Sequence, residues 1–220
     1  MTRRDLLALA VAAALLPSPA TLPRSLSIAL LLDVSFSVTP GQLASESSFE
    51  EVIRAVTKQF QPGDSAVIGL VASRVAFGPA NRSSAKELTA DWRQLLVAPP
   101  SERFGPSPLF DALDAGVSRV HARPGARAVV LWTDGRPTGN LLGAEDAGAR
   151  AATAGVSLNV IVDDKTWRTD PQRGPRGIET ACQVFDTMAR MTGGVCLVNS
   201  RGTSATVEQL QRVLEQLRNR

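Results

Sequence analysis

Short apolar runs alternate along this chain with longer amphipathic stretches, and this alternation restricts the fold more than any other feature of the sequence. The first run, residues 26–32, is almost continuously apolar and ends at Asp33, as a strand does when both of its faces are buried. Strands of this kind, separated by helices, form largely parallel sheets with helices on each face. The pattern therefore predicts an α/β fold with a doubly wound, mostly parallel central sheet.

The same two patterns, apolar runs and amphipathic stretches, locate the other expected strands and helices. Apolar runs predict further strands at 66–72, 126–133, 156–162 and 195–198, and a short antiparallel edge strand at 74–77. Apolar residues at helical spacing predict helices at 39–60, 88–96, 109–120, 142–154, 178–191 and 205–217. The last helix carries a single apolar stripe and is expected to be a fixed part of the core, with a helix that docks in more than one register as the alternative.

The first 20 residues have the layout of an export signal. A basic pair, Arg3 and Arg4, precedes an apolar run at 6–16, which Pro17 ends before a site of small residues at 18–20. The apolar run is about half the roughly 20 residues that a spanning helix requires. No permanent membrane span is therefore expected, and an anchoring N-terminal helix is the alternative.

This segment sets the expected domain boundaries and location. Residues 1–20 are the expected signal, 21–25 a short linker and 26–218 the folded domain. The arginine pair resembles a twin-arginine signal, so export is expected by either the Sec or the Tat route. The mature protein is expected in the periplasm or outside the cell, and the preference for arginine over lysine indicates a bacterial source.

Composition and charge exclude several classes of function. The formal net charge is +3, from 24 basic and 21 acidic side chains, and there is no tyrosine. Nucleic-acid binders carry a clustered basic face with interleaved aromatics, so no nucleic-acid partner is expected. Two cysteines and one histidine disfavour a zinc site. The chain has neither a Gly-x-Ser-x-Gly elbow nor a phosphate-binding glycine-rich loop, and it is not expected to be an enzyme.

Polar side chains stand where the expected strands stop. Asp33 opens an Asp-x-Ser-x-Ser loop that continues with Ser35 and Ser37, so one carboxylate and two hydroxyls occupy alternate positions. Asp134 follows the strand at 126–133, and Ser107 precedes a helix that it is expected to cap. Ligands of open α/β sheets bind outside the carboxyl ends of the strands. An all-oxygen set of this kind suits a hard divalent cation such as Mg²⁺.

These three loops resemble the metal-ion-dependent adhesion site of von Willebrand factor type A domains, and the resemblance extends over about residues 26–218. Asp33, Ser35 and Ser37 match the first loop of that family, Ser107 takes the place of its usual threonine, and Asp134 matches the acid of its third loop. The resemblance implies a Rossmann-like fold, with the three hydroxyls as direct or near-direct metal ligands. It also implies that the two carboxylates bind directly or through water.

The implied function is an exported, metal-dependent binding module without catalytic activity. Mg²⁺ is the expected cation, with Mn²⁺ and Ca²⁺ as alternatives, and a protein partner would offer an acidic side chain to it. Two alternatives stay open: a metal-assisted hydrolase, and an accessory subunit that works with an ATPase in an envelope complex.

A long polar segment at 163–177 follows the fourth of the expected parallel strands and reaches the same sheet edge. Trp167 is a candidate apolar anchor for a partner, and Arg168, Arg173 and Arg176 are candidate partners for its acidic groups. A solvated loop without a binding role is the alternative.

The two cysteines, Cys182 and Cys196, are expected to remain buried thiols. Export would place them in an oxidising compartment, where a disulfide is chemically feasible. However, a residue near the start of a helix and one at the start of the next strand are expected at opposite edges of the sheet. That separation exceeds what a disulfide spans.

Overall fold

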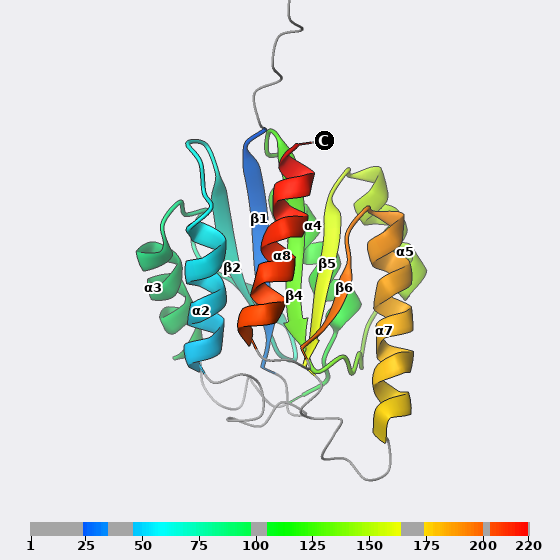
Figure 1. Ribbon diagram of the computed structural model, residues 1–220. Coiled ribbons are helices and arrows are strands. Elements are labelled where there is room, and N and C mark those ends of the chain that lie inside the picture. Colours follow the sequence, from blue (N-terminus) through cyan, green and yellow to red (C-terminus); the bar gives the residue numbers. More distant parts are fainter. Residues whose placement is uncertain (1–23, 35–45, 98–104, 164–173, 200–202, 220) are drawn as a thin grey trace, which may run out of the picture.

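The central sheet has six strands in the order β3-β2-β1-β4-β5-β6 (Figure 1). A computed structural model describes residues 24–34, 46–97, 105–163, 174–199 and 203–219. The strands are β1 (Leu26–Asp33), β2 (Ser65–Val71), β3 (Val75–Phe77), β4 (Ala126–Thr133), β5 (Ser157–Asp163) and β6 (Cys196–Asn199). All neighbouring strands pair in parallel except β3, which pairs antiparallel with β2. The predicted parallel sheet with one antiparallel edge strand is confirmed.

Helices cover both faces of this sheet. One face carries α2 (Glu46–Thr57), α3 (Ala85–Leu96) and α8 (Thr203–Arg218), and the other carries α4 (Leu109–Val120), α5 (Ala144–Thr153) and α7 (Gly174–Met191). Within the described residues, no helix combines the length and the apolar character needed to cross a bilayer.

Alternating side chains of β1 explain why its sequence is almost continuously apolar. Ile28 and Leu30 belong to the core on the side of α2, α3 and α8, whereas Ala29 and Leu31 belong to the core on the side of α4, α5 and α7. All eight residues of β1 are buried. A polar side chain on either face would be desolvated, so the strand is apolar from Ile28 until it reaches Asp33, and the polar residue before that run, Ser27, is also buried.

Several helix boundaries differ from those predicted, and helix α3 begins three residues early, at Ala85. Helix α2 ends at Thr57, whose hydroxyl donates to the carbonyl of Ile53, so Phe60 lies beyond the helix. The predicted start of this helix at residue 39 lies outside the described residues. Helix α5 begins at Ala144 because the backbone amides of Leu141 and Leu142 donate to a side chain of α4 instead. Helix α7 begins four residues before the predicted start, at Gly174.

The C-terminal helix is fixed at its last turn by a buried ion pair. Arg218 Nη2 lies 2.5 Å from Asp64 Oδ2, and the two residues are 6% and 2% exposed. Asp64 also accepts the backbone amides of Leu26 at 2.7 Å and of Gln61 at 2.7 Å. This contact joins α8 to the start of β1 and to the turn before β2.

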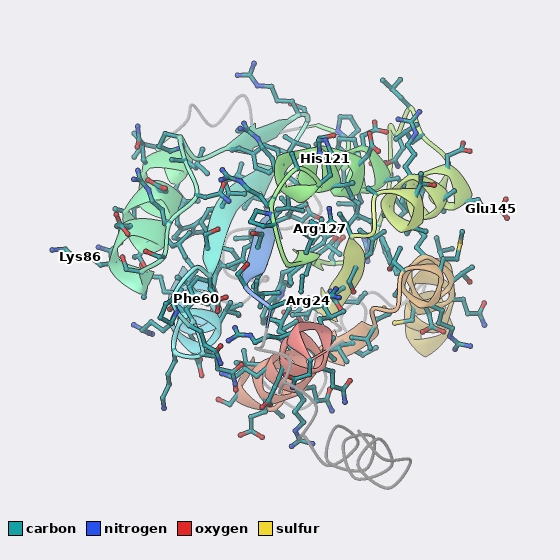
Figure 2. The ribbon with its side chains drawn as sticks, turned by 90° about the horizontal axis from the view of Figure 1, so that it is seen from above. Arg24, Phe60, Lys86, His121, Arg127 and Glu145 are labelled. Atoms are coloured by element: carbon teal, nitrogen blue, oxygen red, sulfur yellow. The ribbon has the colours of Figure 1, made fainter. Side chains whose placement is uncertain are left out.

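The edge of the sheet formed by the amino ends of the parallel strands carries different charged side chains from the edge formed by their carboxyl ends. Figure 2, seen from above the amino ends of the parallel strands, shows Arg24, Arg127 and His121 at that edge. Arg127 Nη1 donates to the carbonyl of His121 at 2.6 Å. Acidic side chains follow the carboxyl ends of the strands at the opposite edge. The fold therefore separates a basic edge from the edge at which the candidate site lies.

The prediction that the two cysteines lie far apart is wrong. Cys182 lies in the middle of α7 rather than near its start, and its thiol forms a hydrogen bond with the thiol of Cys196. The chain leaves α7 at Met191 and runs back beside the helix before β6 begins, which brings Cys196 level with Cys182. Both side chains are partly exposed rather than buried, and they form no disulfide.

Gly194 makes this return of the chain sterically feasible. A Cβ atom at this position would lie 1.9 Å from the carbonyl oxygen of Leu158 and 2.8 Å from Ser157 Oγ. Gly194→Ala is therefore expected to lower the free energy of unfolding by about 1 to 3 kcal/mol, measured by urea denaturation. Gly148→Ala is a matched control, because its new Cβ would meet only flexible methionine atoms at 3.3 Å or more, together with the Met188 Cα at 3.5 Å. Equal stability of the two variants would contradict this assignment.

Candidate metal site

Two carboxylates stand at the ends of adjacent parallel strands. Asp33 ends β1 and Asp134 follows β4 directly, and both are 0% exposed. The register of these strands pairs Leu32 with Trp132, so the two acids emerge at the same edge of the sheet. The predicted neighbours Ser35 and Ser37 lie outside the described residues. The strand order thus places two buried negative charges side by side at one edge.

Thr133 orients the first of these carboxylates. Its hydroxyl donates to Asp33 Oδ2 at 2.7 Å and accepts the backbone amide of Gly135 at 3.0 Å, and the residue is fully buried. Sequence reasoning did not assign this residue a role. The available signal was a polar threonine that ends the apolar run at 128–132, directly before the candidate acid.

A cation from the chain itself lies beside the second carboxylate. The backbone amide of Arg136 donates to Asp134 Oδ1 at 3.0 Å, and Arg136 Nε lies 3.8 Å from Asp134 Oδ2. The Arg136 side chain is 21% exposed, so it lies close to the surface whereas the carboxylate is buried. One guanidinium therefore partly balances the charge at this edge.

Ser107 is held by the loop that follows Asp134. Its backbone amide donates to Thr138 Oγ1 at 2.8 Å, and its carbonyl accepts the amide of Thr138 at 2.8 Å. One turn further on, the amide of Phe110 donates to Asn140 Oδ1 at 2.8 Å. These contacts fix Ser107, which is 3% exposed, relative to the carboxyl end of β4.

The prediction that Ser107 caps its helix is wrong. Helix α4 begins at Leu109, and its N-cap is Pro108, which offers no side-chain acceptor. The Ser107 carbonyl accepts the amide of Leu109 at 2.8 Å. Two residues from the helix start, the Ser107 hydroxyl lies beyond the position from which a cap reaches the first-turn amides.

A third buried acid lies at the same edge and was not among the predicted ligands. Asp163 ends β5 and is paired in register with Asn199 of β6, whose Nδ2 donates to Asp163 Oδ2 at 3.5 Å. The two residues are 0% and 2% exposed. This polar pair continues the row of oxygen-bearing side chains along the sheet edge beyond Asp134.

The predicted partner-binding segment lies almost entirely outside the described residues. Trp167, Arg168 and Arg173 are among the residues that the structure does not describe. Arg176 lies in the first turns of α7, which begins at Gly174, but the position of its side chain is not described. Their proposed roles stay predictions.

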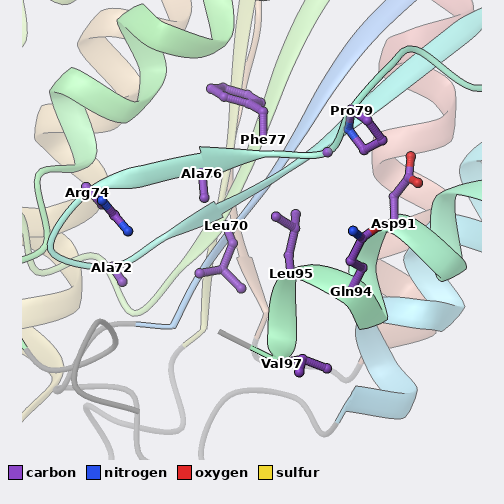
Figure 3. Close-up of a pocket in the computed structure, with 11 residues that line it drawn as sticks. Leu70, Ala72, Arg74, Ala76, Phe77, Pro79, Asp91, Gln94, Leu95 and Val97 are labelled. Carbon is purple, nitrogen blue, oxygen red and sulfur yellow. The ribbon is translucent and has the colours of Figure 1, made fainter. Parts of the chain in front are cut away.

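A groove on the side of α3 is separate from the candidate metal site. It encloses about 490 Å³ between the β2–β3 hairpin and α3, and Figure 3 shows Leu70, Phe77 and Leu95 along it. None of the candidate ligands lines it. Its acidic residue, Asp91, already binds Arg82, with Arg82 Nε 3.0 Å from Asp91 Oδ2. The groove is therefore not the candidate metal site.

The donor set fits a hard cation. Two fully buried carboxylates and a nearly buried serine hydroxyl lie at one sheet edge, and a divalent cation would compensate both negative charges. Within the described ranges, no three histidine, cysteine, aspartate or glutamate side chains form a group able to hold a metal. A cation here would accordingly depend on hydroxyl ligands as well as on the two acids.

Known structures share this fold, although no family model and no curated protein matches the chain. An aerotolerance-related membrane protein from Bacteroides fragilis is 18% identical, with a TM-score of 0.63 over 87% of this chain and 100% of the other. A von Willebrand factor type A protein from Catenulispora acidiphila is 12% identical, with a TM-score of 0.61 over 87% of this chain and 42% of the other.

A third structure of this fold holds a metal. Proximal thread matrix protein 1 from the mussel byssus, solved with a zinc-occupied adhesion-site motif, is 17% identical, with a TM-score of 0.60. The match covers 90% of this chain and 46% of that protein. Taken together, the likenesses show that the chain has the Rossmann-like fold of von Willebrand factor type A domains.

Proposed function

We propose that this chain, with its von Willebrand factor type A fold, is a binding module that holds a divalent cation at the carboxyl edge of its sheet. Through that cation it engages a carboxylate of a protein partner. The observation that carries the proposal is the joint burial of Asp33, Asp134 and Ser107 at the ends of neighbouring elements. The one histidine of the chain, His121, lies at the opposite edge of the sheet, so these buried carboxylates suit binding better than histidine-assisted bond cleavage.

Each residue has a separate role in this proposal. Asp33, held by Thr133, and Asp134 provide the negative charge that retains the cation, directly or through water. Ser107 adds a neutral oxygen, and Ser35 and Ser37 complete the set. Mg²⁺ fits an all-oxygen site of this size, and Mn²⁺ and Ca²⁺ are the alternatives to test. When bound, the cation supplies a positive charge and an open coordination position for the partner's carboxylate.

The proposed location is the cell envelope. Residues 1–20 have the composition of an export signal, and the similar structure from Bacteroides fragilis is described as a membrane protein. The segment with Trp167, Arg168, Arg173 and Arg176 would contact the partner around the cation. An accessory role in an envelope complex is compatible with the same site, since such a subunit would use the same exposed cation.

Calorimetric titration with Mg²⁺, Mn²⁺ and Ca²⁺ tests the site. Saturable binding by the purified protein is expected, with loss of that binding in Asp33→Ala. Glu145→Gln is a matched control, because it removes one negative charge from an exposed position on α5. Equal binding by the wild type and Asp33→Ala, or loss of binding in both variants, would contradict the proposed site.

Arg136→Gln is expected to strengthen cation binding about three- to tenfold, because it removes a positive charge 3.8 Å from a proposed ligand atom of Asp134. The gain is expected to diminish at high salt, since the guanidinium is partly exposed. The same titration measures it. A variant that binds more tightly cannot be explained by general damage to the fold, and unchanged or weaker binding would argue against a cation at Asp134.

A further inference from the structure

The two thiols of this chain meet on the side of the sheet opposite α8. Cys182 projects from the middle of α7 and Cys196 begins β6, and both pack against the core formed by α4, α5 and α7. A direct hydrogen bond joins the two thiols. Figure 1 shows α7 alongside β6, in agreement with this contact. The neighbouring apolar side chains, Phe185 and Met188, hold the helix against the sheet.

The environment gives the two sulfur atoms unequal reactivity. The hydrogen bond with Cys196 lowers the pKa of Cys182, and this effect exceeds the opposing effects of burial and of the nearby carboxylate of Asp186. The same hydrogen bond, together with burial, raises the pKa of Cys196. A thiolate is the attacking species in thiol–disulfide exchange. Cys182 is therefore the nucleophile of the pair.

We propose that Cys182 and Cys196 form an intramolecular disulfide that ties α7 to the edge strand β6. The oxidant is a small-molecule or protein disulfide. The Cys182 thiolate attacks one sulfur of that disulfide, forms a mixed disulfide and releases the first thiol. The Cys196 sulfur, after losing its proton to solvent, then attacks Cys182 Sγ and releases the second thiol. Two protein thiols are oxidised by two electrons, and one disulfide is reduced to two thiols.

The bond would stabilise the least protected strand of the parallel sheet. Strand β6 is paired only with β5, and three of its four residues are partly exposed or exposed, whereas every residue of β5 is buried. Helix α7 also follows directly after the segment at 164–173 that carries the proposed partner contacts. A covalent link at Cys182 would therefore fix the helix on which that segment ends.

Oxidation of the full chain in glutathione buffers tests the proposal. At a high ratio of oxidised to reduced glutathione, intact mass is expected to fall by two hydrogen atoms, and peptide mapping is expected to join Cys182 to Cys196. The midpoint of thermal unfolding is expected to rise by about 5 to 10 °C relative to the reduced protein. Brief alkylation of the reduced protein near neutral pH is expected to label Cys182 before Cys196.

Single replacements complete the test. Cys182→Ala and Cys196→Ala are each expected to abolish the difference between the oxidised and reduced melting temperatures. The comparison of oxidised with reduced wild-type protein needs neither variant, so it remains valid if one of them does not fold. A stable glutathione adduct, a disulfide-linked dimer, or two alkylatable thiols after oxidation would each overturn the proposal.

Discussion

Arg218→Met is expected to lower the free energy of unfolding by about 3 to 5 kcal/mol, because it leaves a buried carboxylate without its cation. Arg218 Nη2 lies 2.5 Å from Asp64 Oδ2, and the Asp64 side chain is 0% exposed. Methionine retains much of the apolar part of the arginine side chain, so the loss of stability measures mainly the effect of removing the positive charge. For a chain of this size the midpoint of thermal unfolding is expected to fall by roughly 6 to 20 °C. Urea denaturation and a thermal melt measure the two quantities.

Two variants separate this effect from general damage to α8. Arg212→Met changes an exposed arginine of the same helix and is expected to alter stability by less than about 0.5 kcal/mol. The double variant Asp64→Asn, Arg218→Met removes the buried charge together with its partner, and it is expected to be more stable than Arg218→Met alone. A double variant less stable than the single one would show that charge burial is not the cause.

Thr133→Val is expected to weaken cation binding by about 10- to 100-fold, as is typical when a group that orients a metal ligand is removed. Valine has the shape of threonine but cannot donate to Asp33 Oδ2 or accept the amide of Gly135, bonds that measure 2.7 Å and 3.0 Å. The same change is expected to cost about 2 to 3 kcal/mol of stability, because both groups are buried. Calorimetric titration and urea denaturation give the two values.

Thr133→Ser keeps the hydroxyl and is expected to retain cation affinity within a few-fold of the wild type. Comparing serine with valine therefore separates the hydrogen bond from the loss of a methyl group. If both variants bind the cation as tightly as the wild type while valine alone lowers stability, Thr133 has only a structural role. Loss of binding in the serine variant would contradict the assigned hydrogen-bond role.

The sequence predicted the strands more accurately than the helices. Strand β4 has the predicted limits, and its buried apolar run at 128–132 stops where the polar Thr133 and Asp134 follow. Helix ends depend on contacts that are distant in the chain. Helix α5 begins late because Asp111, some 30 residues earlier, accepts the amides of Leu141 and Leu142. Local periodicity carries no information about such a contact.

In the candidate site, too, local sequence patterns predicted some features, whereas features that depend on distant contacts were missed. Asp33 and Asp134 could be placed at one edge from the ends of two apolar runs, since parallel strands bring their carboxyl ends together. The polar Thr133 at the end of an apolar run was a signal in the sequence, but the hydrogen bonds of Thr133 and Thr138 could not be predicted, because they form across the sheet and between loops. The contact between Cys182 and Cys196 was missed for a related reason: it depends on the path that the chain takes after α7.

The contacts at the end of α8 also determine where the two ends of the folded domain lie. The backbone amide of Arg24 donates to the carbonyl of Arg218 at 3.3 Å, so the two ends of the folded unit emerge together at the amino edge of the sheet. The C-terminal end in Figure 1 lies at that edge, and the carboxyl ends of β1, β4 and β5, where the acids lie, are at the other. A flanking sequence or tether attached at either end of the folded unit therefore starts at the edge of the sheet opposite the proposed cation. If the domain is anchored at one of these ends, the proposed binding face would point away from the anchor.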